Sequence, residues 1–328
     1  MEALLGEAGR CFHIITPVIE SKALSKAAGT RVYMKLDNIQ PTGSFKIRGI
    51  GYFCQEVSSK CAGSLERHLF TGRGRGNAGL AAAYAAKKLG IPITIIVPTS
   101  WAAPAPLENS SCFLFCQAWD DAKERAQALA EAKGWEIIHP FDHPLVWKGH
   151  ASLVRELRDS LDAKPGAIVL AVGGGGLLAG VVAGLKEVGW LDVPIVAAET
   201  HGADSFNASV KAGRLVTLMS ITSVATCLGA RTVAPRALEC ASECPILSEV
   251  LEDVEAVEAV EQFLDDERML VEPACGASLA VLYSGHIQRL QREGRLRPDL
   301  DSIVIIVCGG SAIHMAELQA LKSQLGMK

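Results

Sequence analysis

Apolar residues recur along the second half of the chain in two alternating patterns. Short apolar runs alternate with longer segments whose apolar residues follow the spacing of a helix face. Because apolar strands joined through helices are typical of a parallel sheet covered on both faces, the pattern predicts an α/β fold. The expected strands cover residues 167–172, 194–198 and 302–308, and the expected helices cover residues 150–161, 176–188, 204–212, 252–266, 273–290 and 313–325.

The first half of the chain carries the same alternation with one interruption. Asn77 is expected to cap a helix that extends to Leu89. Residues 99–117 show neither helical nor alternating spacing, and we assign no element to them. The expected strands cover residues 32–36, 69–71, 93–97 and 136–138, and the other expected helices cover residues 46–59 and 118–133.

These elements predict two domains that share a cleft, which a length of 328 residues allows. The stretch at residues 139–144 marks the crossing from the smaller domain to the larger one. We therefore expect a large domain built from residues 1–40 and 141–328, and a small domain built from residues 41–140.

Composition narrows the class of protein. Hydrophobic residues make up 49% of the chain, enough for a sizeable core, and the formal net charge is −4. This charge gives no electrostatic basis for binding nucleic acid or an anionic membrane surface. The ten cysteines show no metal-ligand spacing, so we expect reduced thiols in a cytoplasmic enzyme.

One segment requires a test for membrane insertion. Residues 167–185 are uncharged and about long enough to cross a bilayer. Four consecutive glycines interrupt this segment, and each costs a helix about 1 kcal/mol relative to alanine. A strand, a glycine loop and a helix explain it better. Residues 1–10 also lack the pattern of a targeting signal, so we expect a soluble protein.

The four glycines, Gly173, Gly174, Gly175 and Gly176, follow an expected strand and open an expected helix. In that position backbone N–H groups close on an anion and the helix dipole favours negative charge. The anion has two candidate sources. Gly174, Gly176 and Ala179 fit the dinucleotide pattern Gly-x-Gly-x-x-Ala, with Glu199 ending the next strand, whereas a smaller cofactor would place a single phosphate there.

Lys46 lies between a Gly-Ser turn and the expected first turn of a helix. On its own it is most simply a solvated surface lysine. A lysine that forms a Schiff base, a glycine loop for one phosphate and a polar group near a pyridine nitrogen together describe a pyridoxal phosphate (PLP) site. Lys46, Asn77, the four glycines and Cys308-Gly-Gly-Ser311 follow the order found in PLP enzymes of the tryptophan-synthase β fold.

Three stretches carry a closer resemblance, at residues 41–51, 141–154 and 270–277. Through them the sequence resembles the animal L-serine dehydratase/L-threonine deaminase family. The resemblance implies a two-domain α/β PLP enzyme of fold type II, in which the small domain carries the Schiff-base lysine. It also implies a homodimer that converts L-serine, L-threonine or both to pyruvate or 2-oxobutanoate and ammonia.

The resemblance implies roles for individual residues. Lys46 would carry the cofactor and act as the base on the substrate Cα, and burial beside Phe45 would favour the lowered pKa that this needs. Asn77 would contact the phenolic oxygen of PLP, and Cys308 would face its pyridine nitrogen. The phosphate would bind the backbone N–H groups of Gly173, Gly174, Gly175, Gly176 and Leu177.

The resemblance also implies a substrate site and a cation site. Residues expected to bind the substrate are Ser44, Gly74, Arg75, Gly76 and Asn77. A monovalent cation such as K⁺ would bind backbone carbonyls near Glu199, at Gly173, Ala203, Leu228 and Ala230. Simpler interpretations are that Cys308 is a small buried apolar residue and that Asn77 is only a helix cap.

The chain departs from the family in the loop before Asn77. Gly74 stands where the family has a serine that binds the substrate carboxylate, and Arg75 stands where it has a small residue. Arg75 would crowd the cofactor, or could pair with a carboxylate through two hydrogen bonds. The alternative function is therefore a catalytically impaired PLP-binding relative with a regulatory role or none. A dinucleotide oxidoreductase is a third hypothesis, but it leaves Lys46 and Cys308 unexplained.

Overall fold

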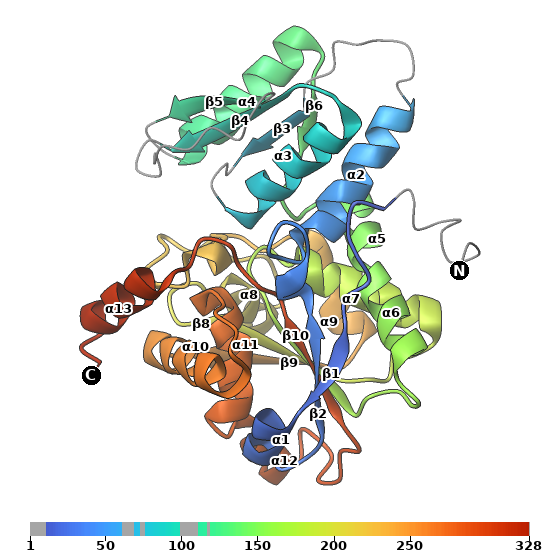
Figure 1. Cartoon of the computed structure of the whole chain (residues 1–328), viewed down its shortest axis with the longest axis vertical. Coiled ribbons are helices and arrows are strands. Elements are labelled where there is room, and N and C mark those ends of the chain that lie inside the picture. The colour runs from blue at the N-terminus through green and yellow to red at the C-terminus, as the bar shows by residue number, and fades with distance from the viewer. Residues whose placement is uncertain (1–10, 61–68, 73–75, 99–110, 117–118, 328) are drawn as a thin grey trace.

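The computed structural model describes residues 11–60, 69–72, 76–98, 111–116 and 119–327 (Figure 1). Its larger sheet has six strands in the order β1-β2-β10-β7-β8-β9, and every neighbouring pair is parallel except β1 and β2. These strands are β1 (Val18–Ser21), β2 (Val32–Leu36), β7 (Ala167–Ala171), β8 (Ile195–Thr200), β9 (Ile246–Leu251) and β10 (Ile303–Val307).

Helices pack on this sheet because its central strands are apolar on both faces. Every residue of β7, β8 and β10 is buried, as expected for a parallel sheet covered on both sides. The helices and short 3₁₀ turns of this part are α1 (Lys22–Ala28), η2 (Asp37–Ile39), α6 (Ser152–Ser160), α7 (Gly176–Val188), α8 (Ser205–Ala212), η4 (Thr226–Leu228), α9 (Pro235–Glu243), α10 (Asp253–Glu267), α11 (Pro273–Tyr283), α12 (His286–Arg292) and α13 (Met315–Gln324).

The smaller sheet lies at the top of Figure 1 and is parallel throughout, in the order β5-β4-β3-β6. Its strands all come from residues 69–138, inside the predicted small domain, whose boundaries remain a prediction. The elements of this part are α2 (Lys46–Lys60), β3 (Leu69–Gly72), α3 (Asn77–Leu89), β4 (Ile93–Pro98), β5 (Ser111–Cys116), α4 (Trp119–Lys133) and β6 (Glu136–Ile138). Helix α5 (Pro144–His150) packs against both α2 and α7 and so lies between the two parts.

Several sequence predictions need correction. Residues 99–117 include strand β5, whose apolar run lacks the alternation that marks a half-buried strand. The helix expected over residues 273–290 is two helices, because Gly285 adopts a φ of +73° between α11 and α12. The helix expected from residue 150 begins earlier, at Pro144, and divides into α5 and α6 at Ala151. The sequence patterns also missed β1, α1, α9 and β9.

The glycine-rich segment at residues 167–185 forms β7, a loop and most of α7, as predicted. Among the helices that the structure describes, none is long and apolar enough to cross a bilayer.

A buried ion cluster joins the two parts of the chain at the start of α2. Arg48 has no exposed surface, and its guanidinium donates to Asp37 at 2.7 and 2.8 Å and to Glu156 at 2.5 and 2.8 Å. Lys35 Nζ also donates to Glu156 Oε2, at 2.5 Å. Burial would raise the pKa of Asp37, but the Arg48 guanidinium holds it below its usual value. Two cations and two carboxylates therefore balance inside the protein.

Replacing Arg48 by methionine removes the guanidinium but keeps a long side chain. Asp37 and Glu156 would then lie buried with one cation fewer, and losing one partner of a buried ion pair costs about 3–5 kcal/mol. We expect that loss in the free energy of unfolding, measured in urea. Arg155→Ala is the matched control because its ion pair with Glu187 is exposed, and we expect a change below about 1 kcal/mol. Equal effects of the two changes would contradict the structural role of Arg48.

Candidate active site

One cavity lies where the carboxyl ends of β7 and β10 meet the N-termini of α2, α3, α7 and α11. Ligands of open α/β sheets bind at this kind of edge, beyond the carboxyl ends of the strands. The residues that line the cavity are Phe45, Lys46, Gly76, Asn77, Ala78, Pro140, Phe141, Ala171, Gly173, Gly174, Gly175, Gly176, Leu177, Thr226, Cys227, Leu228, Ala230, Glu272, Ala274, Cys308 and Gly309.

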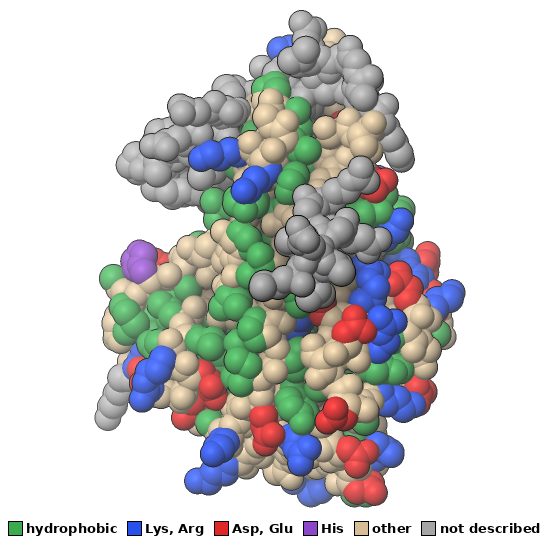
Figure 2. Space-filling view, turned by 45° about the vertical axis from the view of Figure 1, so that its right-hand side comes forward, with side chains coloured by type: hydrophobic (Ala, Val, Ile, Leu, Met, Phe, Trp, Pro, Cys, Tyr) green, Lys and Arg blue, Asp and Glu red, His purple; other side chains and the backbone are tan. Residues whose placement is uncertain are grey.

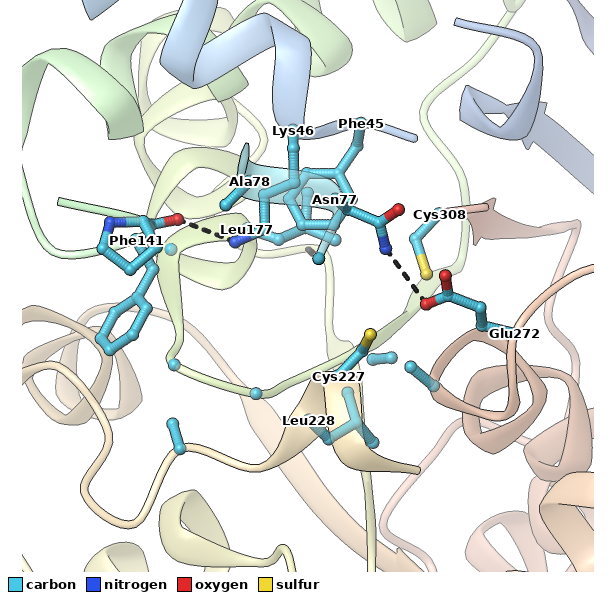
Figure 3. A pocket seen from close by; sticks show the side chains of 18 of the residues that line it. Phe45, Lys46, Asn77, Ala78, Phe141, Leu177, Cys227, Leu228, Glu272 and Cys308 are labelled. Atoms are coloured by element: carbon cyan, nitrogen blue, oxygen red, sulfur yellow. Dashed lines mark hydrogen bonds between the residues drawn. The ribbon is translucent and has the colours of Figure 1, made fainter. Parts of the chain in front are cut away.

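Lys46 is the first residue of α2, and its side chain points into the cavity (Figure 3). Its Nζ donates to the Pro140 carbonyl at 2.8 Å and lies 5.2 Å from the centre of the Phe45 ring. Phe45 also packs against the buried ring of His150, with 5.0 Å between ring centres. The Phe45 N–H donates to the Cys308 carbonyl at 3.2 Å, which ties the start of α2 to the end of β10.

The glycine loop passes over Phe141 so closely that side chains would not fit. A Cβ on Gly174 would lie 2.3 Å from Cγ of Phe141, and a Cβ on Gly176 would lie 2.7 Å from the Phe141 carbonyl oxygen. That oxygen also accepts from Trp147 Nε1 at 2.8 Å. Gly175 adopts a φ of +87° at the N-cap of α7, so the first N–H groups of the helix lack intrahelical acceptors. The loop therefore fits a phosphate group.

Asn77 does not cap α3, which corrects the sequence prediction. Gly76 is the N-cap and Asn77 is the first helical residue. The Asn77 amide instead reaches across the cavity edge: its Nδ2 donates to Glu272 Oε2 at 3.1 Å, and its Oδ1 accepts from the Ser311 N–H at 3.1 Å and hydroxyl at 3.0 Å. The simpler interpretation of Asn77 as only a helix cap is wrong.

Cys308 follows β10 and lines the cavity although only 7% of it is exposed. A hydrogen bond with the Cys275 thiol and burial raise the pKa of Cys308 well above the usual thiol value. Cys308 is therefore a neutral thiol in the physiological range. Cys227, which the sequence did not single out, also lines the cavity and points its sulfur toward the interior (Figure 3).

Of the residues predicted to hold a cation, Gly173, Leu228 and Ala230 lie close to one another. A Cβ on Gly173 would lie 3.0 Å from Cα and 3.2 Å from the carbonyl oxygen of Leu228, whose oxygen accepts from the Ala230 N–H. Ala203 follows β8 and donates its N–H to Thr200. Among the described residues, His, Cys, Asp and Glu side chains form no cluster of three or more that could hold a metal. A cation here would therefore depend on backbone carbonyls.

Glu199 lies one residue before the end of β8, and its carboxyl group is fully buried. Burial raises its pKa to about 8, against the effect of the Phe206 and Asn207 N–H groups that donate to it at 2.8 and 2.7 Å. A neighbouring cation would favour the ionised form of this group.

The predicted substrate residues are only partly brought together. Gly76 and Asn77 line the cavity, whereas Gly74 and Arg75 lie outside the described residues. Ser44 is buried, its hydroxyl has no hydrogen-bond partner within the described part of the chain, and its backbone pairs with Gly309.

Glu272 is the main site residue that the sequence analysis missed. It is 4% exposed, lines the cavity and contacts Asn77. Residues 270–277 resemble the family as a stretch, but a glutamate before a helix-starting proline does not reveal which surface it faces.

Comparisons with known proteins agree with this geometry. The family model described as "Pyridoxal-phosphate dependent enzyme" matches residues 12–309. The human protein named serine dehydratase-like is 62% identical, with 96% of this chain and 95% of that protein covered. The human L-serine dehydratase/L-threonine deaminase is 55% identical, with 97% of each chain covered.

A solved structure gives the same result for the fold. The crystal structure of a fungal L-serine ammonia-lyase from Rhizomucor miehei matches with a TM-score of 0.86 at 36% sequence identity, covering 95% of this chain and 99% of that one. The predicted α/β fold of the tryptophan-synthase β type is confirmed. The chain belongs to the pyridoxal-phosphate dependent enzymes.

Proposed function

We propose that this protein is an L-serine/L-threonine ammonia-lyase, which eliminates water from L-serine, L-threonine or both; hydrolysis by a second water molecule then releases pyruvate or 2-oxobutanoate with ammonia. The observation that carries the proposal is the meeting of Lys46, the glycine loop and Cys308 around one cavity. The names of the relatives, serine dehydratase and threonine deaminase, support the same reaction.

The proposed roles follow from the position of each group. PLP, when bound, withdraws electrons from the bonds at the substrate Cα. The backbone N–H groups of Gly173, Gly174, Gly175, Gly176 and Leu177 would bind its phosphate, and Phe45 would contact the cofactor. Lys46 carries the cofactor and removes the proton from Cα, which requires an amine inside the cavity. The Pro140 carbonyl, 2.8 Å from Lys46 Nζ, holds the amine there.

Cys308 sets the reaction type in this proposal. The Cys308 thiol is held neutral by Cys275 and by burial, so it provides no negative charge to pair with a protonated pyridine nitrogen. Such a site withdraws electrons less strongly than one with an aspartate, which suits loss of a β-hydroxyl better than transamination.

The alternative is a PLP-binding relative with impaired catalysis. The observation that favours it is the loop sequence, in which Gly74 cannot donate a hydroxyl to a substrate carboxylate and Arg75 replaces a small residue. In this alternative the cofactor binds at Lys46 and the protein has a regulatory role or none.

The remaining features are proposals that rest on the sequence pattern and on the resemblance to the family. We propose a division into a small domain at residues 41–140 and a large domain at residues 1–40 and 141–328, a homodimer, and a location in the cytoplasm. We also propose that K⁺ binds the carbonyls of Gly173, Ala203, Leu228 and Ala230.

A visible absorption spectrum of the purified protein tests the function directly. We expect an absorption band from PLP bound to Lys46, a change of that band on addition of L-serine, and formation of pyruvate. Lys46→Ala removes the amine, so its spectrum should lack the band. A band that does not respond to serine or threonine would support the alternative, and Gly74→Ser with Arg75→Gly should then restore the response. If wild type and Lys46→Ala have the same spectrum, the assignment of Lys46 is wrong.

Gly174→Ala tests the glycine loop as the phosphate site. Its Cβ would overlap the Phe141 ring, and overpacking of this kind costs about 1–3 kcal/mol. We expect at least tenfold weaker PLP binding, measured by absorbance titration, and partial recovery in the double variant with Phe141→Ala. Gly189→Ala is the control because Gly189 ends the same helix in open space and outside the cavity lining. Its φ of +74° strains an alanine at that helix end, but the dissociation constant of PLP should be unchanged. Equal losses in both variants would contradict the assignment.

Thermal unfolding tests the cation site through Glu199. Its pKa in the fold is about 8, so between pH 4.5 and 8 the folded state keeps a proton that the unfolded state releases. Stability without K⁺ should therefore fall as pH rises through this range. We expect K⁺ to raise the melting temperature and to flatten this fall, relative to tetramethylammonium.

Glu199→Gln cannot ionise and should show a flatter pH profile in both salts. Identical melting temperatures in K⁺ and tetramethylammonium across the whole pH range would contradict the cation site.

A further inference from the structure

Three side chains from distant parts of the sequence meet at one edge of the cavity. Asn77 begins α3, Glu272 precedes α11, and Ser311 follows the glycine pair after β10. Figure 3 shows Asn77 above the cavity, with its Nδ2 directed toward the carboxylate of Glu272. This contact joins the part of the chain that carries the smaller sheet to the part that carries the larger one.

These partners fix which way the Asn77 amide faces. A backbone N–H can only donate, so the Ser311 N–H must meet Oδ1. A carboxylate can only accept, so Glu272 must meet Nδ2. Turning the amide over would place Nδ2 against the Ser311 N–H, a donor against a donor. It would also place Oδ1 against the Glu272 carboxylate, an acceptor against an acceptor. An Asn Nδ2 carries two N–H groups, and Glu272 takes one of them. The other is left for an acceptor in the cavity that Asn77 lines.

Glu272 is itself held firmly in this position. Its Oε1 accepts from the Ala312 N–H at 2.9 Å, so each carboxylate oxygen has its own donor. The chain passes over the carboxylate at Gly310, which adopts a φ of +133° and where a Cβ would lie 2.3 Å from the Glu272 side chain. Only glycine allows this approach. The glycine pair after Cys308 therefore brings Ser311 to Asn77 and Ala312 to Glu272.

We propose that Glu272 and Ser311 are positioning residues, which orient the Asn77 amide so that its second N–H donates to the phenolic oxygen of PLP. This inference rests on the proposed function, because it takes the cofactor and the role of Asn77 from there. It adds two residues that act on the cofactor ring through Asn77 and not by direct contact.

The phenolic oxygen offers a selective test. Glu272→Leu removes both carboxylate oxygens, including the acceptor of the Asn77 amide. Ser311→Ala removes the hydroxyl that donates to Asn77 Oδ1, while the backbone N–H of residue 311 still donates to it. Dissociation constants are measured by absorbance titration with PLP and with 3-deoxypyridoxal phosphate, which lacks the phenolic oxygen but keeps the aldehyde and the phosphate. A positioning role predicts a loss of affinity for PLP only, because the analogue has no oxygen for the oriented N–H.

We expect Glu272→Leu to bind PLP about tenfold more weakly, as loss of one hydrogen bond implies, and to bind the analogue within about twofold of wild type. Ser311→Ala should show the same selectivity with a loss of about threefold. Ser311 is exposed, so this variant carries the test if Glu272→Leu does not fold. Glu249→Leu removes another carboxylate that is 4% exposed, on β9 and not among the residues that line the cavity, and should not discriminate between the two cofactors.

The outcomes separate this inference from the proposed function. Equal losses for PLP and the analogue would show that Glu272 and Ser311 only support the fold, which overturns the inference and leaves the function standing. Unchanged affinity for PLP in both variants would overturn it as well. If wild type binds neither cofactor, the proposed function itself fails.

Discussion

The buried charge of Arg48 constrains the whole arrangement around the cavity. A guanidinium without exposed surface is tolerated only when its N–H groups meet acceptors, and these come from Asp37, Glu156, Ser152 and Thr16. The acceptors lie on η2, on α6 and on the segment before β1, all outside the smaller sheet. These contacts tie the first turn of α2 to the part of the chain that carries the larger sheet. Lys46, two residues before Arg48, is fixed along with it.

A buried ion cluster of this kind is weak evidence for added stability, because the desolvation of the charges offsets much of their attraction. The cluster instead fixes the orientation of the Arg48 side chain, because both carboxylates contact Arg48 through both oxygens. A lysine could not make these paired contacts. The cluster orients α2 on one side, and the Phe45 N–H holds it to the Cys308 carbonyl on the other. Together these contacts place the amine of Lys46 at the carboxyl end of the large sheet.

The sequence predicted those parts of the fold in which one local pattern decides the structure. Strands β7, β8 and β10 agree with their predictions to within about two residues, because uninterrupted apolar runs between breakers have few alternatives. Strand β9 carries Ser248 and Glu249 at the edge of the sheet and shows no such run. The break at Gly285 was missed for a similar reason: a single glycine inside an apolar pattern does not reveal its φ.

The residues of the candidate site also divide into those that a local sequence pattern reveals and those that it does not. Lys46, the glycine loop and Cys308 could be found because each belongs to a recognisable short motif at the start or end of an element. Glu272 could not, because its contact with Asn77 spans 195 positions and depends on the path of the chain at Gly310. The prediction that Asn77 caps α3 was wrong because it considered only partners close in sequence. A polar residue at a helix start favours capping when only local partners are considered, whereas here Gly76 holds the cap position and tertiary partners take the amide.

The electrostatics of the cavity are consistent with a cofactor whose ring keeps a neutral neighbour at its nitrogen. Glu272 brings a carboxylate to the cavity edge, but its two oxygens are taken by the Asn77 amide and the Ala312 N–H. Its charge adds to the Cys275 contact and to burial in raising the pKa of Cys308, so the Cys308 thiol stays protonated. In the proposed site, this one carboxylate would orient the Asn77 amide and would also keep negative charge off the Cys308 sulfur. An anionic sulfur at that position would hold a proton on the pyridine nitrogen and strengthen its electron withdrawal, which favours transamination over elimination. The neutral thiol is therefore the part of the cavity that most directly connects its packing to the proposed reaction.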